Sequence, residues 1–310
     1  MSINLTNSAT LIRPNVAADL TDLEFTETDL LNWFESRGYV KPNDGGAPYL
    51  WDIKTGSTIT AEIFTEGQGL PVPGAPTFRQ ASVPAVYYRV IVTNTGHTRD
   101  QVARRGVYQD PIAVGLDNGL KKLRALIDAT LAGTAANRSI LSAVDGADVY
   151  GGLDPATVTE WAGYEVNVGG ALTLAATNTM WRSLVDTPRG ASPTDTLVSL
   201  LQFERYTSLG GPASSAAGYQ PRQERGLPFD LGMMREMASH NGAAFTPIRS
   251  LATTEMLMLD PSDGIELREQ RPLEVEKLAK VNDDDVSQMS RALVLVIRNR
   301  RKQGKLTGLS

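Results

Sequence analysis

The side chains in this chain that could carry acid–base or nucleophilic chemistry are few. The sequence of 310 residues contains no Cys and only two His, and without Cys there is no thiolate nucleophile, disulfide or thiolate metal site. His97 follows Gly96 at the end of a predicted hairpin, and His240 precedes Asn241-Gly242 in a predicted turn. We expect both imidazoles to be solvated polar side chains, because neither stands in a triad or H-E-x-x-H context. No G-x-S-x-G nucleophile motif is present, so the sequence predicts a protein without enzymatic activity.

Three short motifs resemble ligand sites but lack the context that such sites need. Gly67 and Gly69 imitate a dinucleotide fingerprint, yet Pro71 interrupts the place where a helix should begin. Gly304-Lys305 lacks the upstream glycine and the following hydroxyl residue of a phosphate loop. Residues 282–285 could offer oxygen ligands to a divalent cation, but they lack the loop glycine and terminal Glu of a calcium site. We therefore predict no cofactor and no metal, and interpret 282–285 as the capped, solvated start of the next element.

Charge is distributed unevenly along the chain, whose formal net charge is −5. Residues 1–45 hold three basic and seven acidic side chains, a net charge of −4, whereas residues 291–310 hold six basic side chains and no acidic one. This asymmetry favours contacts between opposite ends of different copies, or between the basic end and an anion. The alternative is that the basic end is a solvated edge strand that prevents unwanted pairing. A sequence pI near 5.2 argues against a dedicated DNA-binding protein, although weak contact of one face with a confined polyanion stays open.

The composition indicates a folded protein without a membrane segment. With 41% apolar residues the chain can fill the core of one large domain or of two lobes. Its longest apolar runs, such as Ala292–Ile297, are far shorter than the roughly 20 residues of a membrane helix, and its start lacks a charged-then-apolar signal pattern. We expect a soluble protein made in the cytosol, with no membrane partner.

The N-terminal region is predicted to be an arm that contains one short helix. Thr26 followed by Asp29 resembles a capping box, and apolar residues after it share one helical face before Gly38 ends the helix. These apolar residues are Leu30, Leu31 and Phe34. The two dozen residues before the helix are mostly polar, so we expect them to become ordered only against a partner.

A long hairpin is predicted to follow the arm. Residues 57–65 and 83–93 alternate apolar and polar side chains with the period of a strand. Between them, the glycine and proline residues of segment 67–76 forbid regular structure and form a tip. Apolar side chains on such a projecting tip should seek the surface of a partner. The alternative is a hairpin that folds back onto its own core.

The longest predicted helix begins at Asp110-Pro111, an N-cap followed by a proline-tolerant first position, and ends at Gly133. Its apolar side chains recur at steps of three and four residues, so one face is apolar. The later predicted elements are a helix that ends before Pro188, a strand and helix at 197–209, a hairpin of 256–260 and 265–269 joined by a type I turn at 261–264, and a buried strand at 293–297. The irregular interleaving of helices and strands indicates an α+β fold.

The order of these parts resembles that of the major capsid proteins of tailed phages, which have the Hong Kong 97-type fold. Two segments also resemble local motifs of that family, the stretch from Gly151-Gly152-Leu153-Asp154 through Trp161-Ala162-Gly163 and the C-terminal run 297–306. The resemblance covers nearly the whole chain. It implies an N-terminal arm at 1–45, an extended loop at 46–106, a peripheral domain with the spine helix at 107–170, an axial domain at 171–260, and return strands of the peripheral domain at 261–310.

The same resemblance implies a shell subunit that self-assembles into pentamers and hexamers around packaged double-stranded DNA. Such a protein would be made in the host cytoplasm and located in the capsid head of the virion, and its inner surface would contact DNA without sequence specificity. The short arm implies a separate scaffolding protein or none, and a portal and a cement protein are further implied partners. Because no lysine stands between Lys54 and Lys121, the tip offers no amine for a cross-link, and we expect a shell without covalent bonds between subunits.

Two alternatives to the phage capsid stay open. An encapsulin nanocompartment shares the fold but encloses cargo enzymes, and the acidic start with no recognisable cargo-peptide groove favours the virus. A monomeric hydrolase or ligand-binding protein with a β-rich lid at 53–96 would instead have a concave pocket with convergent polar groups. For a shell protein, the candidate intersubunit contacts are large apolar side chains on projecting segments. These candidates are Trp33, Phe34, Leu70, Val72 and Phe78.

Overall fold

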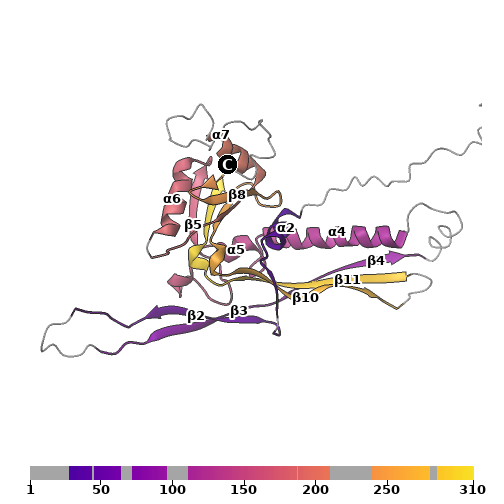
Figure 1. Cartoon of the computed structure of the whole chain (residues 1–310), viewed down its shortest axis with the longest axis horizontal. Helices are drawn as coiled ribbons and strands as arrows, with labels where there is room; N and C mark the ends of the chain where they lie inside the picture. Colours follow the sequence, from indigo (N-terminus) through magenta and orange to yellow (C-terminus); the bar gives the residue numbers. More distant parts are fainter. Residues whose placement is uncertain are drawn as a thin grey trace, which may run out of the picture.

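The computed structural model describes residues 28–43, 45–63, 72–95, 111–186, 188–209, 239–279 and 285–310. The described part contains two multi-stranded sheets and a hairpin that projects to one side (Figure 1). We call the sheet beneath the long helix α4 (Pro111–Ala132) the lower sheet, and the sheet flanked by α6 (Leu174–Val185) and α7 (Leu200–Leu209) the upper sheet. This combination of helices with parallel and antiparallel strand pairs confirms the predicted α+β class.

The lower sheet has the strand order β1-β10-β11-β4. Its strands are Val40–Pro42 (β1), Ile265–Lys277 (β10), Asp285–Ile297 (β11) and Val86–Asn94 (β4), of which only β1 and β10 pair in parallel. Helix α4, Pro111–Ala132, lies along this sheet and confirms the longest predicted helix. Gly119 allows the close approach, because a Cβ atom there would lie 2.5 Å from Met289 Cε and 2.8 Å from Val92 Cγ2. The predicted buried strand at 293–297 is the C-terminal part of β11.

The projecting hairpin consists of β2, Tyr49–Ser57, and β3, Pro76–Val83, which pair antiparallel. The predicted strand limits are therefore wrong: residues 58–63 are not in a strand, and the second predicted strand is β4, which pairs with β11. The physical reason is burial, since Ala81 and Val83 of β3 reach the core whereas Ile59 and Ile63 remain exposed. Residues 64 and 65 of the first predicted strand and residues 67–71 of the predicted tip lie outside the described residues.

The upper sheet has the strand order β5-β12-β9-β6-β8-β7. Its strands are Tyr164–Gly170 (β5), Gly304–Leu309 (β12), Met256–Leu259 (β9), Asp195–Val198 (β6), Ala243–Pro247 (β8) and Ser239–His240 (β7). Helix α6, Leu174–Val185, confirms the helix predicted before Pro188. Strand β6 and helix α7, Leu200–Leu209, confirm the strand and helix predicted near 197–209. Met180, Phe203 and Met256 belong to the core cluster that these helices and strands share.

The chain crosses between the two sheets twice near its C-terminal end. From β9 it passes through the turn η3, Pro261–Asp263, and through Gly264 with φ of +98° into β10. The predicted turn is present, but the predicted hairpin is wrong, because β9 pairs with β6 and β12 whereas β10 pairs with β1 and β11. The second crossing runs from β11 through η4, Arg300–Lys302, into β12. Since β12 lies between β5 and β9 and Lys305 is buried, the basic end is not a solvated edge strand.

Helix α2, Asp29–Ser36, confirms the short helix predicted in the arm. Its side chains Leu30, Leu31 and Phe34 are buried in the same core cluster as the apolar face of α4. Gly38 follows with φ of +70°, as expected for a glycine that ends a helix. Thr26 of the predicted capping box lies outside the described residues, and Thr28 at the N-cap makes no capping bond with its side chain.

The start of α2 is capped instead by a side chain from α4. Asp128 is fully buried, and its Oδ1 accepts a hydrogen bond from the Leu31 N–H at 2.8 Å. Its Oδ2 lies near the Ser250 hydroxyl, but among the described residues neither of these two atoms has a well-formed hydrogen bond. Burial raises the pKa of Asp128, and the nearby Asp29 carboxylate adds to the rise. The cap therefore joins α2 to α4 through a carboxylate in an unfavourable environment for charge.

We expect Asp128→Ala to lower the free energy of unfolding by about 1–2 kcal/mol, the usual cost of losing an N-cap. Asp128→Asn keeps an oxygen that can accept from Leu31 and removes the buried charge, so it should be at least as stable as the unaltered protein at neutral pH. A raised carboxyl pKa means that the folded state binds more protons than the unfolded state, so the contribution of Asp128 is present at low pH and lost as pH rises. Denaturant unfolding at pH values between about 4 and 8 would check this. The stability advantage of the Asp128→Asn variant over the unaltered protein must grow with pH, and a constant difference contradicts the assignment.

Candidate functional site

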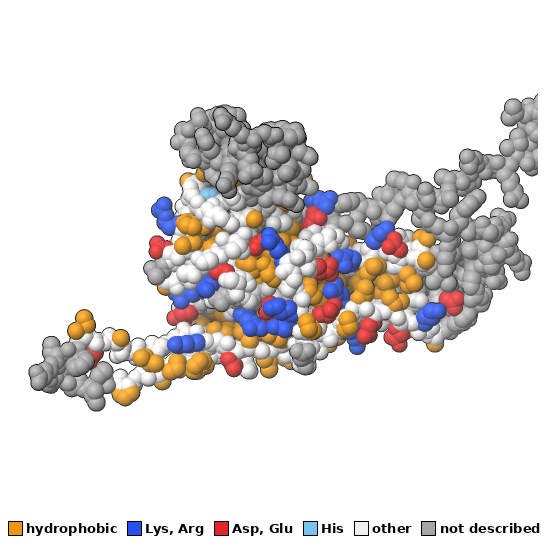
Figure 2. Space-filling view, viewed as in Figure 1, with side chains coloured by type: hydrophobic (Ala, Val, Ile, Leu, Met, Phe, Trp, Pro, Cys, Tyr) orange, Lys and Arg blue, Asp and Glu red, His pale blue; other side chains and the backbone are white. Residues whose placement is uncertain are grey.

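Exposed apolar side chains gather on the projecting hairpin and on the described residues between its two strands. Figure 2 shows apolar side chains along the hairpin, away from the body of the protein. Val72 and Ile63 are 87% and 98% exposed, and Phe78 is 65% exposed. The cross-strand register pairs Leu50 with Ser82 and Lys54 with Phe78, which places Leu50 and Phe78 on the same face. Apolar surface of this kind marks an interaction site on a folded protein.

The base of the hairpin is held by a cluster of aromatic rings. The ring centroid of Trp51 on β2 lies 6.3 Å from those of Tyr150 and of Trp161, which ends the short turn η1, Thr159–Trp161. Tyr150 is fully buried, and its hydroxyl donates to a carbonyl and accepts from an N–H of β11 at 2.8 and 3.0 Å. Burial raises the pKa of Tyr150. The Ser82 N–H donates to the Gly151 carbonyl at 2.9 Å, so both strands of the hairpin are fixed where it leaves the core.

Arg300 lies beside this cluster and is fully buried. Its guanidinium carbon lies 5.4 Å from the ring centroid of Tyr150 and 5.7 Å from that of Trp161. It donates hydrogen bonds to backbone carbonyls at and beyond the end of helix α5, Ile140–Val144: Nε to Ala143 at 2.7 Å, Nη1 to Asp148 at 3.1 Å, and Nη2 to Asp145. Burial lowers the pKa of Arg300 to about 10. Arg300 therefore stays charged at neutral pH and joins the crossing between the sheets to the segment that supports the hairpin.

The structure describes four of the five predicted contact residues, and these four fall into two groups. Trp33 and Phe34 are 4% and 0% exposed, because they lie on the buried side of α2, so they do not present a surface to a neighbouring subunit. Val72 and Phe78 are exposed on the hairpin, as a contact requires. Leu70 lies outside the described residues. Leu50 was not included among the predicted contact residues, because its strand β2 begins before the predicted strand. The alternation of side-chain types from Tyr49 to Lys54 is the signal that could have identified it.

His240 is buried rather than solvated, so the prediction for this residue is wrong. Its Nδ1 lies 3.0 Å from the Tyr206 hydroxyl, and its Nε2 lies 3.3 Å from the Asn241 amide nitrogen. Burial lowers its pKa, which favours the neutral imidazole. The ring is thus a packed polar group at the edge of the upper sheet. His97 lies outside the described residues.

Within the described ranges, no group of three or more His, Cys, Asp or Glu side chains is arranged to hold a metal ion. Residues 282–284 of the Asn-Asp-Asp-Asp run lie outside those ranges, and Asp285 begins β11 instead of a calcium loop. No helix in the described part of the chain is long and apolar enough to cross a membrane.

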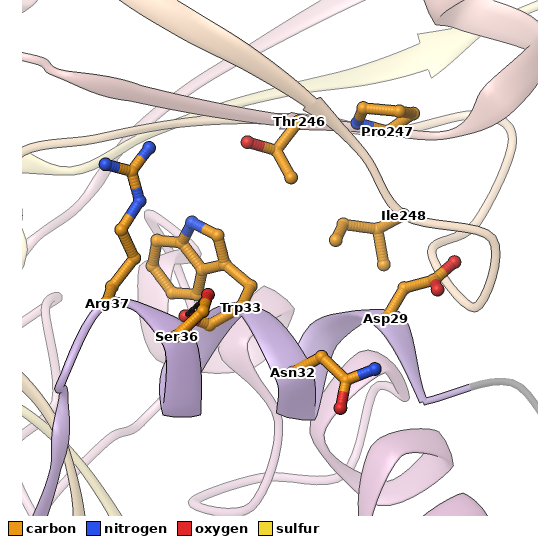
Figure 3. A pocket seen from close by; sticks show the side chains of 8 residues that line it. All are labelled: Asp29, Asn32, Trp33, Ser36, Arg37, Thr246, Pro247 and Ile248. Carbon is orange, nitrogen blue, oxygen red and sulfur yellow. Dashed lines mark hydrogen bonds between the residues drawn. The ribbon is translucent and has the colours of Figure 1, made fainter. Parts of the chain in front are cut away.

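Two hollows meet at Arg37, just after α2. The first, of about 370 Å³, lies between α2 and the end of β8, and we call it the α2 groove (Figure 3). It extends from Asp29 to Arg37 along the helix and is closed on the other side by Thr246, Pro247 and Ile248. The second, of about 470 Å³, lies between β1, η3 and the segment after β11, and we call it the cationic hollow because Arg37, Lys41 and Arg298 line it with the single carboxylate of Glu266.

Comparison with solved structures shows a likeness over the whole chain. The cyanophage A-1(L) capsid subunit is 13% identical with a TM-score of 0.75, and 99% of each chain is covered. The capsid of a native GTA particle is 12% identical with a TM-score of 0.63, covering 100% of this chain and 99% of that one. The SrpI encapsulin from Synechococcus elongatus PCC 7942 is 10% identical with a TM-score of 0.62, covering 100% and 97%. No protein-family model and no curated protein sequence matches the chain.

These likenesses define the class of fold. The chain has the Hong Kong 97-type fold of tailed-phage major capsid proteins, as its sequence resemblance implied. The projecting hairpin and the long helix α4 occupy the places in the chain where the resemblance puts the extended loop and the spine helix.

Proposed function

We propose that the chain is a major capsid protein, a non-enzymatic subunit that self-assembles into pentamers and hexamers to form the icosahedral head shell of a tailed phage around packaged double-stranded DNA. The observation that carries the proposal is the projecting hairpin, whose exposed apolar side chains lie beyond the chain's own core. A neighbouring subunit would remove this surface from water, and repeated head-to-tail contacts of that kind close into rings. The likeness to capsid shells over the full chain supports the proposal.

The proposal assigns parts of the chain to parts of the shell. Within the predicted division, the hairpin belongs to the extended loop at 46–106 and α4 to the peripheral domain at 107–170, with the arm at 1–45, the axial domain at 171–260 and the return strands at 261–310. Val72 and Phe78 are the proposed contact residues, joined by Leu70 of the same tip. The protein is made in the host cytoplasm and resides in the virion head. A separate scaffolding protein, a portal, a cement protein and the packaged DNA are its proposed partners.

Size-exclusion chromatography of the purified full-length protein tests the proposal first. Capsomers or shells should elute at many times the mass of the 33.4 kDa chain, and electron microscopy of those fractions should show rings or closed particles. A monomer at every concentration would contradict assembly. That result would favour the ligand-binding or hydrolase alternative.

The likeness to the SrpI encapsulin favours a second candidate, a nanocompartment shell that encloses cargo enzymes. Both candidates predict particles, so the contents of the particles separate them. Particles from the native source should contain double-stranded DNA if the chain is a phage capsid protein. A co-purifying enzyme without nucleic acid, identified by mass spectrometry, would support the encapsulin.

A further inference from the structure

The cationic hollow carries more positive than negative charge. Glu266, which is 6% exposed, supplies the one carboxylate among the described side chains that line it. Lys41 Nζ lies 2.7 Å from Oε1 of this carboxylate, and Nη2 of Arg268 and of Arg298 lie 2.6 and 3.3 Å from Oε2. Burial alone would raise the pKa of Glu266, but the hydrogen bonds and charges of these cations hold it below its usual range. One negative charge cannot neutralise three positive charges, so the group has a net charge of +2.

A further cation, Arg37, lines the hollow from the end of α2 and leaves this excess unchanged. Its Nη2 lies 2.9 Å from Oδ1 of the buried Asp195 on β6, so the charge of Arg37 is balanced by its own ion pair. Asp195 belongs to the upper sheet, whereas Lys41 and Glu266 belong to strands of the lower sheet. The hollow and its excess charge therefore lie where the two sheets meet.

Two of the lining cations have hydrogen-bond donors that their contacts within the described ranges do not use. Lys41 carries three N–H groups, and the structure pairs it with Glu266 through one of them. Arg298 uses Nη2 alone, which donates to the Tyr49 hydroxyl at 3.0 Å and to Glu266 at 3.3 Å. The Lys41 and Arg298 side chains are 48% and 43% exposed, so both can bind a ligand that enters from solvent. Arg268 is only 18% exposed and so contributes charge rather than a contact.

The size and the charge of the hollow favour a compact anion that carries two charges. A volume of about 470 Å³ suits a small ligand. A phosphate monoester concentrates a charge of about −1.5 to −2 and three acceptor oxygens in one group, which matches the excess of +2. Lysine and arginine are the side chains that bind phosphate in proteins. The phosphates of a DNA duplex carry one charge each and are spread along its backbone, so they match the hollow less well.

We propose that the cationic hollow binds the phosphate group of a small ligand, either inorganic phosphate or a phosphate monoester, through Lys41 and Arg298 with Arg37 as a third donor. The bound group would connect β1, the segment after β11 and the end of α2, because one of these cations comes from each. Phosphate would thus stabilise the junction of the two sheets. The proposal does not depend on shell assembly, since all of these residues belong to one chain.

Isothermal titration calorimetry of the purified full-length protein tests the ligand, with inorganic phosphate and methyl phosphate as probes at constant ionic strength. Both should bind at one site per chain. Dimethyl phosphate is the matched ligand control, because it keeps the tetrahedral phosphorus but carries one charge, and it should bind at least about tenfold more weakly. A short DNA duplex without terminal phosphates should not displace methyl phosphate. The proposal would be overturned if the diester or the duplex bound as tightly as the monoester, or if neither probe bound at concentrations up to about 10 mM.

Substitutions in the full-length protein test the site. Lys41→Gln and Arg298→Gln should each weaken methyl phosphate binding about tenfold. The matched control is Lys277→Gln, an exposed lysine near the opposite end of β10 from Glu266, and it should bind like the unaltered protein. Thermal unfolding without ligand shows that each variant is folded, and saturating phosphate should raise the unfolding temperature of the unaltered protein and of the control by roughly 5 °C. An equal rise in the double variant of Lys41 and Arg298, or an equal loss of binding in the control, would overturn the proposal.

Discussion

Replacing Arg300 with Met is expected to destabilise the fold strongly. The substitution keeps an unbranched apolar stem but removes the donor from the buried carbonyl of Ala143 and from the carbonyls of the half-buried Asp145 and the exposed Asp148. A buried group that loses its partner costs about 1–3 kcal/mol and one that water can reach costs less, so the total is on the order of 3 kcal/mol. Native domains are stable by only about 5–15 kcal/mol. Soluble expression, circular dichroism and thermal unfolding would measure the loss.

Arg301→Met is the matched control for this prediction. Arg301 is the next residue of η4 and is only half buried, and its carbonyl, which accepts from Arg189 at 2.7 Å, is unaffected by the change. We expect Arg301→Met to fold with a stability within about 1 kcal/mol of the unaltered protein. Arg300→Lys should lie between the two, because an ammonium group cannot reproduce the planar fork. A stable, folded Arg300→Met protein would show that the buried fork is not needed at the crossing.

The elements that were predicted correctly are those whose signals are local. The apolar spacing and the terminal signals of α4, from Pro111 to Gly133, lie within one stretch of sequence, and the structure begins and ends the helix there. The same holds for α2, where three apolar residues and Gly38 sufficed. A helix satisfies its backbone hydrogen bonds internally, so its sequence contains most of the relevant information.

Strand pairing was predicted less well, because the alternation of apolar and polar residues within a strand does not identify the strand that pairs with it. β4 was found near its true limits but was given the wrong partner, since it pairs with β11, some 200 residues later in the chain. β3 was not found, because its exposed half, Pro76–Gln80, has no core to pack against. In the turn after β9, Asp260 and Gly264 give the expected local geometry while the two strands diverge into different sheets.

The buried charges of the candidate site lay beyond what composition can show. Arg300 and Lys305 were counted as part of a basic end in the sequence analysis. Their partners, the Ala143 carbonyl for Arg300 and the Asp145 carboxylate for Lys305, are about 160 residues away in the sequence, so the neighbouring residues do not indicate them. Asp128 likewise has the sequence context of a solvated helix residue, and its burial depends on the contact with Leu31, 97 positions earlier. By contrast, Val72 and Phe78 were correctly expected to be exposed, because a Gly/Pro-rich tip has no core of its own.

The double substitution Val72→Asp with Phe78→Asp is expected to abolish assembly while the subunit stays folded. Both side chains are exposed in the single chain, so their replacement removes no packing from its core. In an assembled shell each would be buried against a neighbour, where an apolar side chain of this size contributes about 1.5–3 kcal/mol. Losing two of them should raise the concentration needed for assembly by about 100-fold or more, since each 1.4 kcal/mol is a factor of ten.

Size-exclusion chromatography and electron microscopy measure the assembly, and thermal unfolding measures the fold. Thr77→Asp is the matched control, because it adds a carboxylate next to Phe78, at an exposed position that points to the other face of the hairpin. We expect this control to assemble like the unaltered protein, since it removes no large apolar side chain from the outward face. The double variant should elute as a smaller species with an unchanged unfolding temperature. Particle yields that match those of the control would contradict the hairpin's role, because the shell would then be held by surfaces other than its exposed apolar face.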